Sequence, residues 1–392
     1  MSEASERPEG SDQGPKRRGK AKKRHTVGMV ILSTMLTLTL VTGLGAVAVY
    51  RSITSNIDGS DAMEHVDNRP EDFDTGPKKA VRILVMASDT RDGEDNKIDN
   101  EEGGLSDTTI LLHISADRTR AYGISIPRDS IVDRPACGPD NSIPEQSEAM
   151  WNAAYKVGGE GCTVEQFEQS TGVRVDGFVT IDFAGFKDMV DAIDGVPICL
   201  PFDVNDDKAK IYLKAGEREV MGDEALDYVR VRNIGDGTDI GRISRQQTFI
   251  ASMVKKVSSA GTLARPDRVL GFLSAVAKSL TISDNINNTK QLAGIALSLQ
   301  NIGMSKVQFV TVPFSYFPRG HQHFGRVAWT DQADELWERV KFDRPLGPEL
   351  TSKAISADRA PGGRGDGGGG KGGKRGPSED EKQAAEFEAR CA

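Results

Sequence analysis

An uninterrupted apolar segment near the N-terminus constrains this chain more than any other feature. Residues 27–50 contain no charged side chain and few polar ones. As a helix, the segment would be about 36 Å long, enough to cross a hydrocarbon core of about 30 Å. We therefore expect a single transmembrane helix that separates a short N-terminal tail from a large domain.

The residues on either side of the apolar segment predict its orientation. A cluster of Lys and Arg occupies positions 16–24, whereas acidic residues follow after Arg51. The positive-inside rule keeps residues 1–26 in the cytoplasm and places the remainder outside the cell membrane. A cleaved signal peptide is the alternative, since Ala46-Val47-Ala48 fits a cleavage site. The apolar run is longer than a typical signal-peptide core, which favours an uncleaved anchor.

Composition divides the exported part into three regions. Residues 51–78 read as a tether, residues 79–345 as a packed domain, and residues 346–392 as a Gly-rich, flexible tail. The formal net charge of −8 argues against nucleic acid as a partner, because basic patches supply most of that affinity.

Strand-like and helix-like patterns alternate within the domain. Apolar runs of strand length lie at 81–87, 108–114, 122–126, 178–183, 196–200 and 307–312. Helical patterns lie at 163–170, where Thr163 is the expected cap, and at 183–193, 223–228, 240–257 and 331–340. This alternation predicts an α/β fold whose sheet is covered by helices on both faces.

Histidine and serine chemistry are poorly supported. Only His113 falls within the predicted core, where a buried strand histidine is the simplest interpretation. The sequence contains no GxSxG motif and no P-loop. Serine–histidine hydrolysis and Walker-type nucleotide binding are therefore unlikely functions for this domain.

Arginines follow or interrupt the apolar runs. Arg128 comes after the strand 122–126 and Pro127, at the sheet edge where α/β proteins bind ligands. The alternation in residues 228–232 predicts a strand that places Arg230 and Arg232 on one face.

The long helical pattern at 240–257 adds a polar stripe. Arg242, Arg245 and Gln246 lie on this stripe, beside an apolar one. Each arginine alone could be a solvated charge or half of a salt bridge. Together they predict a polyanion site, because guanidinium groups bind phosphate oxygens bidentately.

Carboxylates accompany these arginines. Asp89 follows the first predicted strand, and Asp107 begins the second. Acidic groups that converge with arginines favour a hard divalent cation, Mg²⁺ or Mn²⁺, bridging carboxylate and phosphate.

The four cysteines form no CxxC pair, so a zinc site or a thioredoxin-like motif is not expected. Disulfides are permitted outside the cytoplasm, and four cysteines allow three full pairings. Cys137 and Cys162 flank one loop and are the favoured pair.

Ordered motifs between about residues 80 and 260 resemble the LytR-CpsA-Psr family, as does an anchor that precedes an external domain. The motifs are Ser106-Asp107-Thr108-Thr109, Ser125-Ile126-Pro127-Arg128-Asp129, Asn152-Ala153-Ala154-Tyr155 with Gly158-Gly159, Tyr228-Val229-Arg230-Val231-Arg232, and Asp239-Ile240-Gly241-Arg242 with Arg245-Gln246-Gln247.

The resemblance implies a central mixed sheet flanked by helices (α/β/α). It also implies an enzyme that transfers a glycopolymer from a polyprenyl-pyrophosphate carrier to peptidoglycan, a phosphotransferase of the ligase type. The residues it assigns to pyrophosphate binding are Arg91, Arg128, Arg230, Arg232, Arg242 and Gln246. Asp107, with Asp89, would hold Mg²⁺, and the catalytic set would be Asp107, Arg128, Arg230 and Arg232.

Two positions depart from the family pattern. Leu105 stands where many members have arginine, and Met150 stands where many have lysine. Both changes remove positive charge near the expected phosphates. Two alternatives stay open. A pyrophosphatase acting on the same carrier needs the same arginines and metal, with water in place of the sugar hydroxyl. A non-catalytic or regulatory module that binds the lipid carrier is supported best by the two departures.

Overall fold

The computed structural model describes residues 58–73, 78–88, 106–200, 203–207, 210–231, 239–259, 265–287 and 302–359. The chain divides into two compact units, Met1–Arg51 and Ser52–Ala392, and every described residue belongs to the second. The apolar segment 27–50 lies outside the described residues. Within the described part, no helix has both the length and the hydropathy needed to cross a membrane.

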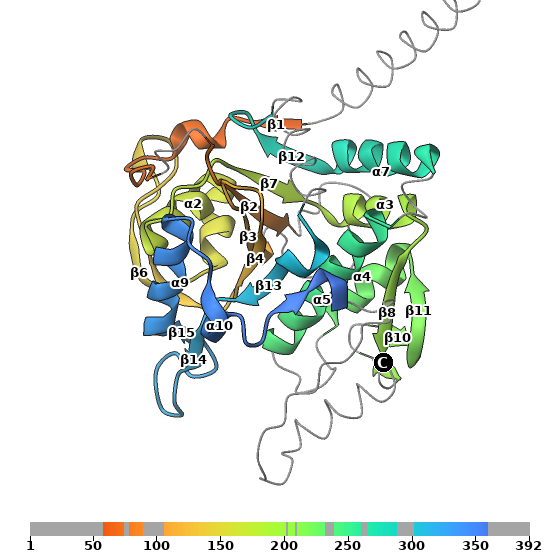
Figure 1. The fold of residues 1–392 in the computed structure, drawn as a ribbon. Helices are drawn as coiled ribbons and strands as arrows, with labels where there is room; N and C mark the ends of the chain where they lie inside the picture. The colour runs from red at the N-terminus through yellow and green to blue at the C-terminus, as the bar shows by residue number, and fades with distance from the viewer. Residues whose placement is uncertain are drawn as a thin grey trace, which may run out of the picture. The chain divides into compact units, whose positions relative to one another are not determined.

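A mixed eight-stranded sheet forms the centre of the described domain (Figure 1). Three neighbouring pairs are parallel, β1 with β12, β7 with β2, and β4 with β13, and the other pairs are antiparallel. In spatial order the strands are β1 (Asp58–Ser60), β12 (Leu280–Ser283), β7 (Gly177–Ile181), β2 (Val81–Ser88), β3 (Ser106–Ile114), β4 (Ala121–Ile126), β13 (Val307–Thr311) and β16 (Ile355–Ser356).

One face of the sheet is covered by α2 (Ala153–Thr171) and α9 (Asp331–Lys341) (Figure 1). Alternate strand residues such as Leu84 and Met86 point to this face, as the period of a strand requires. They pack in one buried cluster with the rings of Trp151, Phe167 and Trp337. This cluster is the largest part of the core.

The opposite face is covered by α5 (Asp239–Val257). Its Ile250 and Val254 pack against Leu112 and Phe309 of the sheet. On its other side, α5 packs Phe249 against α3 (Phe183–Ala192), α4 (Gly222–Arg230) and the hairpin of β8 (Val196–Leu200) and β11 (Gly216–Val220). The helix α5 therefore lies between two apolar clusters, which fix its position over the sheet.

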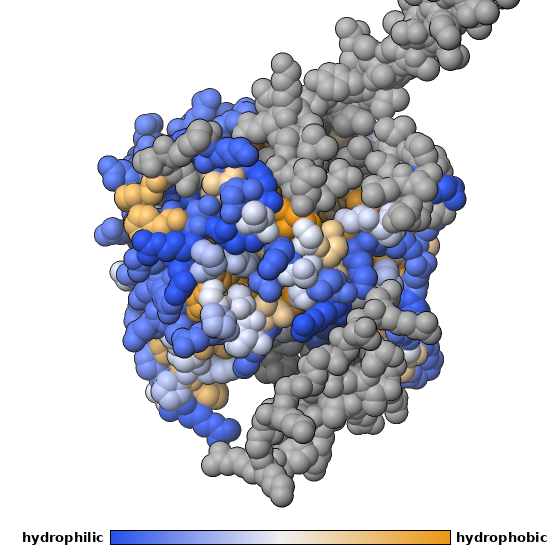
Figure 2. All heavy atoms as spheres, in the orientation of Figure 1, coloured by the Kyte–Doolittle hydropathy of each residue, from blue (hydrophilic) through white to orange (hydrophobic). Residues whose placement is uncertain are grey.

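Shorter elements complete the domain. The hairpins are β5 (Ile131–Arg134) with β6 (Gln146–Met150), β9 (Val204–Asp206) with β10 (Ile211–Leu213), and β14 (Phe314–Tyr316) with β15 (Val327–Trp329). Among the described residues, the other helices are α7 (Pro266–Ser279) and α10 (Gly347–Leu350), and the 3₁₀ turns are η1 (Ala62–His65), η3 (Pro139–Asn141), η4 (Met304–Lys306) and η5 (Ala357–Arg359). The face drawn in Figure 2 is mostly hydrophilic, with apolar side chains in small separate spots.

The expected mixed sheet with helices on both faces is confirmed, but one helix begins earlier than predicted. The expected helix 163–170 is the second half of α2, which starts at Ala153. A kink at Gly158 and Gly159 separates the two halves, and the Thr163 hydroxyl donates to the Gly159 carbonyl (2.9 Å) inside the helix. Gly158 is required because a Cβ there would collide with Cys162 Sγ.

The domain extends beyond the expected limits of 79–345 at both ends. Residues 58–60, expected in a tether, form β1, and Val66 is buried in the main core. At the other end, β16 pairs with β13 and Ala357 is fully buried. The strongly polar composition of both segments concealed these few anchoring residues.

His113 is a buried strand histidine, as expected. Its Nε2 lies 3.0 Å from Asp343 Oδ1, which joins β3 to the residues after α9. Burial lowers the pKa of His113, so the neutral imidazole is the form that the fold favours. Its role is to hold the sheet to α9.

Candidate active site

Four neighbouring strands of the sheet have a terminus at the same end of the sheet. The register pairs Ala87 of β2 with Thr108 of β3, and Thr109 of β3 with Ile126 of β4. Ala87 also pairs with Ile181 of β7. The start of β3 and the ends of β2, β4 and β7 therefore lie side by side at one end of the sheet.

Arg128 lies in the turn after β4, as predicted. Its side chain is 16% exposed, and its Nε is 4.0 Å from Asp129 Oδ1. The segment that contains the NAAY motif packs beside it, since the backbone N–H of Asn152 donates to the Arg128 carbonyl (3.3 Å). The Trp151 indole N–H donates to the Thr109 hydroxyl (3.1 Å), which ties this segment to β3.

Gln246 joins three elements at this edge. The Thr108 hydroxyl donates to Gln246 Oε1 (3.2 Å), and Gln246 Nε2 donates to the Val229 carbonyl (3.1 Å). These bonds connect β3, α5 and α4. Arg242 lies one turn earlier on α5 and is only 3% exposed. Arg245 donates to the Val231 carbonyl, so it braces the chain that leaves α4.

Gln247 holds α5 to the sheet beside this junction. Its Nε2 donates to Ser125 Oγ (2.9 Å), to the Val310 carbonyl (3.0 Å) and to Thr311 Oγ1 (3.1 Å). The side chain is 3% exposed, so these bonds form in a dry environment. The stripe of α5 that carries Arg242 and Gln246 is thereby fixed relative to β4 and β13.

The predicted strand 228–232 is wrong. Residues up to Arg230 form the end of α4, and Val231 is its extended C-cap. The helix forms because Ala225 and Tyr228 are three residues apart and therefore lie on the same side, which is buried. The packing of this side stabilises a helix more than the alternation of apolar and charged residues at 228–232 favours a strand.

Arg230 ends α4 beside the start of α3. Its guanidinium lies over the Phe183 ring, 5.0 Å from the centroid. Burial raises the pKa of the nearby Asp227 carboxyl, while the positive charge of Arg230 opposes that rise. Arg230 is therefore positioned by an aromatic ring and not by a strand face.

Three predicted residues, Asp89, Arg91 and Arg232, lie outside the described residues. Asp107 is the second residue of β3, at an irregularity in the pairing between Ala87 and Ser88. Bulges of this kind are common next to active sites. Over the described part of the chain, no group of three or more His, Cys, Asp or Glu side chains is placed to hold a metal ion.

Cys137 and Cys162 form a disulfide in the structure, with Cα atoms 5.2 Å apart. The bond joins the loop after β5 to the second half of α2. The loop-flanking positions of these cysteines were the signal for this pairing, and the close approach of Gly158 makes room for it.

Sequence reasoning missed Arg326 at the edge of this site. Arg326 NH1 lies 2.7 Å from Asp129 Oδ1, and the Val327 backbone N–H donates to the Asp129 carbonyl (3.2 Å). The residue follows a polar stretch of the β14–β15 hairpin, which gives no strand pattern. Its presence adds one cation next to Arg128.

The sequence was compared with known proteins. The model of the LytR_cpsA_psr family matches residues 48–341. A relative from Bacillus subtilis, polyisoprenyl-teichoic acid–peptidoglycan teichoic acid transferase TagV, is 30% identical over 277 residues, 69% of this chain and 66% of that protein. The cell wall biosynthesis protein LcpA of Corynebacterium glutamicum is 28% identical over 370 residues, 85% of this chain and 68% of that protein.

The fold is shared with a solved structure. The LytR-Csp2A-Psr enzyme from Actinomyces oris superposes with a TM-score of 0.56 at 17% identity, over 77% of this chain and 99% of that chain. The matched part of this chain spans about two thirds of the length of the two curated relatives. The family match covers residues 48–341, from before β1 to the end of α9, and the chain belongs to the LytR_cpsA_psr family.

Proposed function

We propose that this chain is a membrane-anchored phosphotransferase of cell-wall assembly. It moves a glycopolymer, with its linking phosphate, from a polyprenyl-pyrophosphate carrier to a hydroxyl group on peptidoglycan. Family membership and similarity to the teichoic acid transferase TagV support this function. The observation that carries it is the junction at Gln246, which brings Arg242 and the end of α4 to the sheet edge where Arg128 follows β4.

The proposed reaction needs positioning and charge more than covalent chemistry. The acceptor hydroxyl oxygen bonds to the phosphorus that carries the glycan, and the bond from that phosphorus to the bridging oxygen breaks. Polyprenyl phosphate leaves with the electron pair, and the hydroxyl proton passes to water. Arg128, Arg230 and Arg242 would donate hydrogen bonds to the phosphate oxygens and offset the charge of the transition state.

We further propose Mg²⁺, or Mn²⁺ in its place, as the cofactor. Asp107 is the second residue of β3, and Asp89 follows β2 in the sequence. Their carboxylates would hold the ion, because one or two protein carboxylates are the usual ligands of Mg²⁺ beside substrate phosphates. When bound, the ion would supply further positive charge at the pyrophosphate.

The anchor and the location belong to the same proposal. Residues 27–50 would span the cell membrane once, with the N-terminus in the cytoplasm and the domain outside. This arrangement places the domain where both a membrane-bound lipid carrier and peptidoglycan are within reach.

The proposal is tested with the full chain in detergent, a polyprenyl-pyrophosphate-linked glycan, Mg²⁺ and peptidoglycan oligomers. Wild-type protein should form a phosphodiester-linked product. We expect Arg128→Ala and Arg230→Ala each to lower the rate about 30- to 1000-fold, as for a lost transition-state donor. Lysine should restore little, because an ammonium group lacks the planar fork.

Arg344→Ala is the matched control, because Arg344 is 60% exposed and its nearest acidic partner, Glu338, is 4.0 Å away. Its rate should equal that of the wild type, and loss of the contact between its guanidinium and the Phe342 ring should cost at most about 1 kcal/mol of stability. Release of polyprenyl phosphate without acceptor, and no phosphodiester product with it, would identify a pyrophosphatase. Near-wild-type turnover for both Arg128→Ala and Arg230→Ala, in folded protein, would place the chemistry elsewhere.

A further inference from the structure

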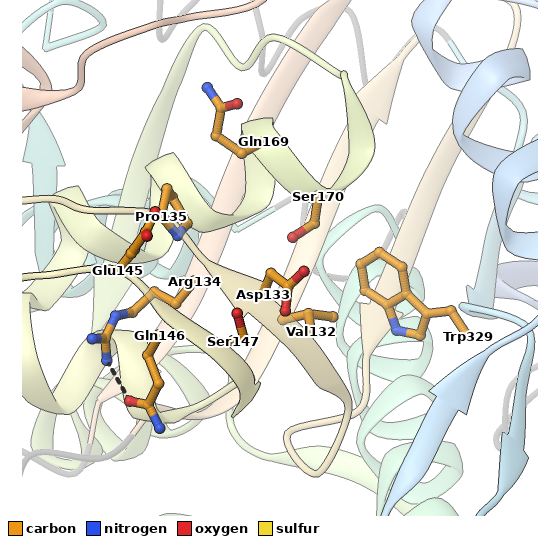
Figure 3. Close-up of a pocket in the computed structure, with 10 residues that line it drawn as sticks. All are labelled: Val132, Asp133, Arg134, Pro135, Glu145, Gln146, Ser147, Gln169, Ser170 and Trp329. Carbon is orange, nitrogen blue, oxygen red and sulfur yellow. Dashed lines mark hydrogen bonds between the residues drawn. The ribbon is translucent and has the colours of Figure 1, made fainter.

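A polar groove lies beside the candidate active site and is not used by the mechanism above. It is a cavity of about 490 Å³ between β5, β6, the C-terminal end of α2 and β15 (Figure 3). Figure 3 shows Trp329 on one side of the cavity and Glu145 on the other, with Asp133 and Ser147 between them. Ser170 of α2 forms the remaining wall.

The side chains of the groove both donate and accept hydrogen bonds. The hydroxyls of Ser147 and Ser170 do both, while the carboxylates of Asp133 and Glu145 accept. Among the described residues, neither serine hydroxyl has a hydrogen-bond partner, and Asp133 uses one oxygen for the backbone N–H of Glu148 (3.0 Å). The groove therefore offers mixed donors and acceptors around one aromatic surface.

This lining selects among classes of ligand. Two carboxylates disfavour phosphate and other anions, because like charges repel. Arg134 has few N–H groups left for an anion, since it is only 5% exposed and donates to Gln146 Oε1 (3.3 Å) and the Pro144 carbonyl (2.8 Å). A lipid chain is disfavoured by the polar walls. A saccharide fits, because its hydroxyls donate and accept while its C–H face packs on an indole ring.

The groove is built on fixed elements, which favours binding without reorganisation. The Trp329 indole N–H donates to Ser130 Oγ (3.0 Å), and its ring lies 5.9 Å from that of Trp151 and 5.7 Å from that of Trp337. The Cys137–Cys162 disulfide joins the loop that follows β5 to α2.

The groove also borders the phosphate-binding edge. Ser130, which orients Trp329, is two residues after Arg128 in the same turn. We propose that the acceptor glycan strand of peptidoglycan binds in this groove, with a sugar ring on Trp329 and its hydroxyls on Asp133, Glu145, Ser147 and Ser170. This inference rests on the proposed function, because it names where the acceptor of that reaction binds.

Binding is tested without lipid donor, using the full chain in detergent. Soluble glycan-strand fragments of peptidoglycan, with and without stem peptides, are titrated and heats of binding measured. Wild-type protein should bind both kinds of fragment saturably. Asp133→Asn, and Ser147→Ala combined with Ser170→Ala, should each weaken binding roughly tenfold. Ser352→Ala, an exposed serine away from the groove, is the control and should bind as the wild type does.

The transfer assay separates this inference from the proposed function. The groove variants should raise the KM for acceptor about tenfold with kcat near the wild-type value, whereas Arg128→Ala should lower kcat and leave fragment binding unchanged. Unaltered fragment binding in the groove variants, binding that requires the stem peptide, or no saturable binding by the wild type would overturn the groove assignment. If the wild type binds fragments through the groove but makes no product, the assignment of the groove is supported and the proposed transferase function is refuted.

Discussion

At the scale of single residues, Glu165 gives the domain a predictable response to pH. This α2 residue is 1% exposed. Burial raises the pKa of its carboxyl from 4.5 to about 7, and the Asp67 carboxylate adds to the rise. Between these two pH values the folded protein holds a proton that the unfolded chain has lost. As the pH rises from 4.5 to above 7, ionisation of Glu165 should therefore lower the free energy of unfolding by roughly 3 kcal/mol.

Glu165→Gln should remove this dependence, because an amide does not ionise. The variant should be more stable than the wild type at pH 8, and the difference in the free energy of unfolding should shrink as the pH falls from 7 to 4.5. Urea unfolding at several pH values measures this. Glu349→Gln, at an exposed position, is the control and should leave the wild-type profile unchanged. A difference between wild type and Glu165→Gln that stays constant with pH would show that Glu165 does not titrate in this range.

At the scale of elements, the helix α5 determines the geometry of the site. Its stripe of Arg242 and Gln246 is held at the strand ends by the two apolar clusters around α5 and by Gln247, which is bonded to β4 and β13. A displacement of about 1 Å by this helix would move the phosphate-binding groups away from Arg128, and catalysis is sensitive to such displacements.

Gln247→Leu should therefore affect both stability and activity. It removes the amide whose two N–H groups are shared among Ser125 Oγ, the Val310 carbonyl and Thr311 Oγ1, and the loss of this buried donor should cost roughly 2–4 kcal/mol. Turnover should also fall, because α5 would no longer be held in place, even though Gln247 bonds to the sheet and does not contact the substrate. Ser244→Ala, on the exposed side of α5, is the control. Thermal unfolding and the transfer assay measure the two effects, and wild-type turnover in folded Gln247→Leu would refute the positioning role.

The elements differ in how well the sequence predicts them. The strands β2, β3 and β4 are apolar runs, and their predicted limits agree with the structure to within two residues. The hairpin of β5 and β6 is polar and largely exposed, so no hydrophobic period marks it, and the groove it lines was not foreseen. For Gln247, the sequence places the residue on a helix but cannot show which strands it bonds, because those contacts are far apart in the chain.

At the scale of the whole domain, the segment before β2 is part of the fold. It supplies β1 to the sheet, Val66 to the core, and Arg69, whose NH2 lies 2.6 Å from Glu168 Oε1. The polar sequence of 51–78 predicted a tether, and among the described residues of this segment only Val66 is buried.

A chain that begins at residue 79 should therefore be markedly less stable than one that begins at residue 52. The loss of Val66 alone should cost about 1.5–3 kcal/mol, and the lost strand pairing and ion pair add to it. Thermal unfolding of the two chains measures the difference. Arg69→Ala in the longer chain measures the contribution of the ion pair alone. Equal unfolding midpoints for the two chains would show that residues 58–73 are a tether and do not stabilise the fold.

The strand β1 has a further consequence for how copies of this protein behave together. The two outermost strands of the sheet, β1 and β16, are three and two residues long. A bare sheet edge offers unpaired N–H and C=O groups that can template pairing with another chain. Edges this short offer few such groups, so many copies should be able to crowd together without joining edge to edge into aggregates.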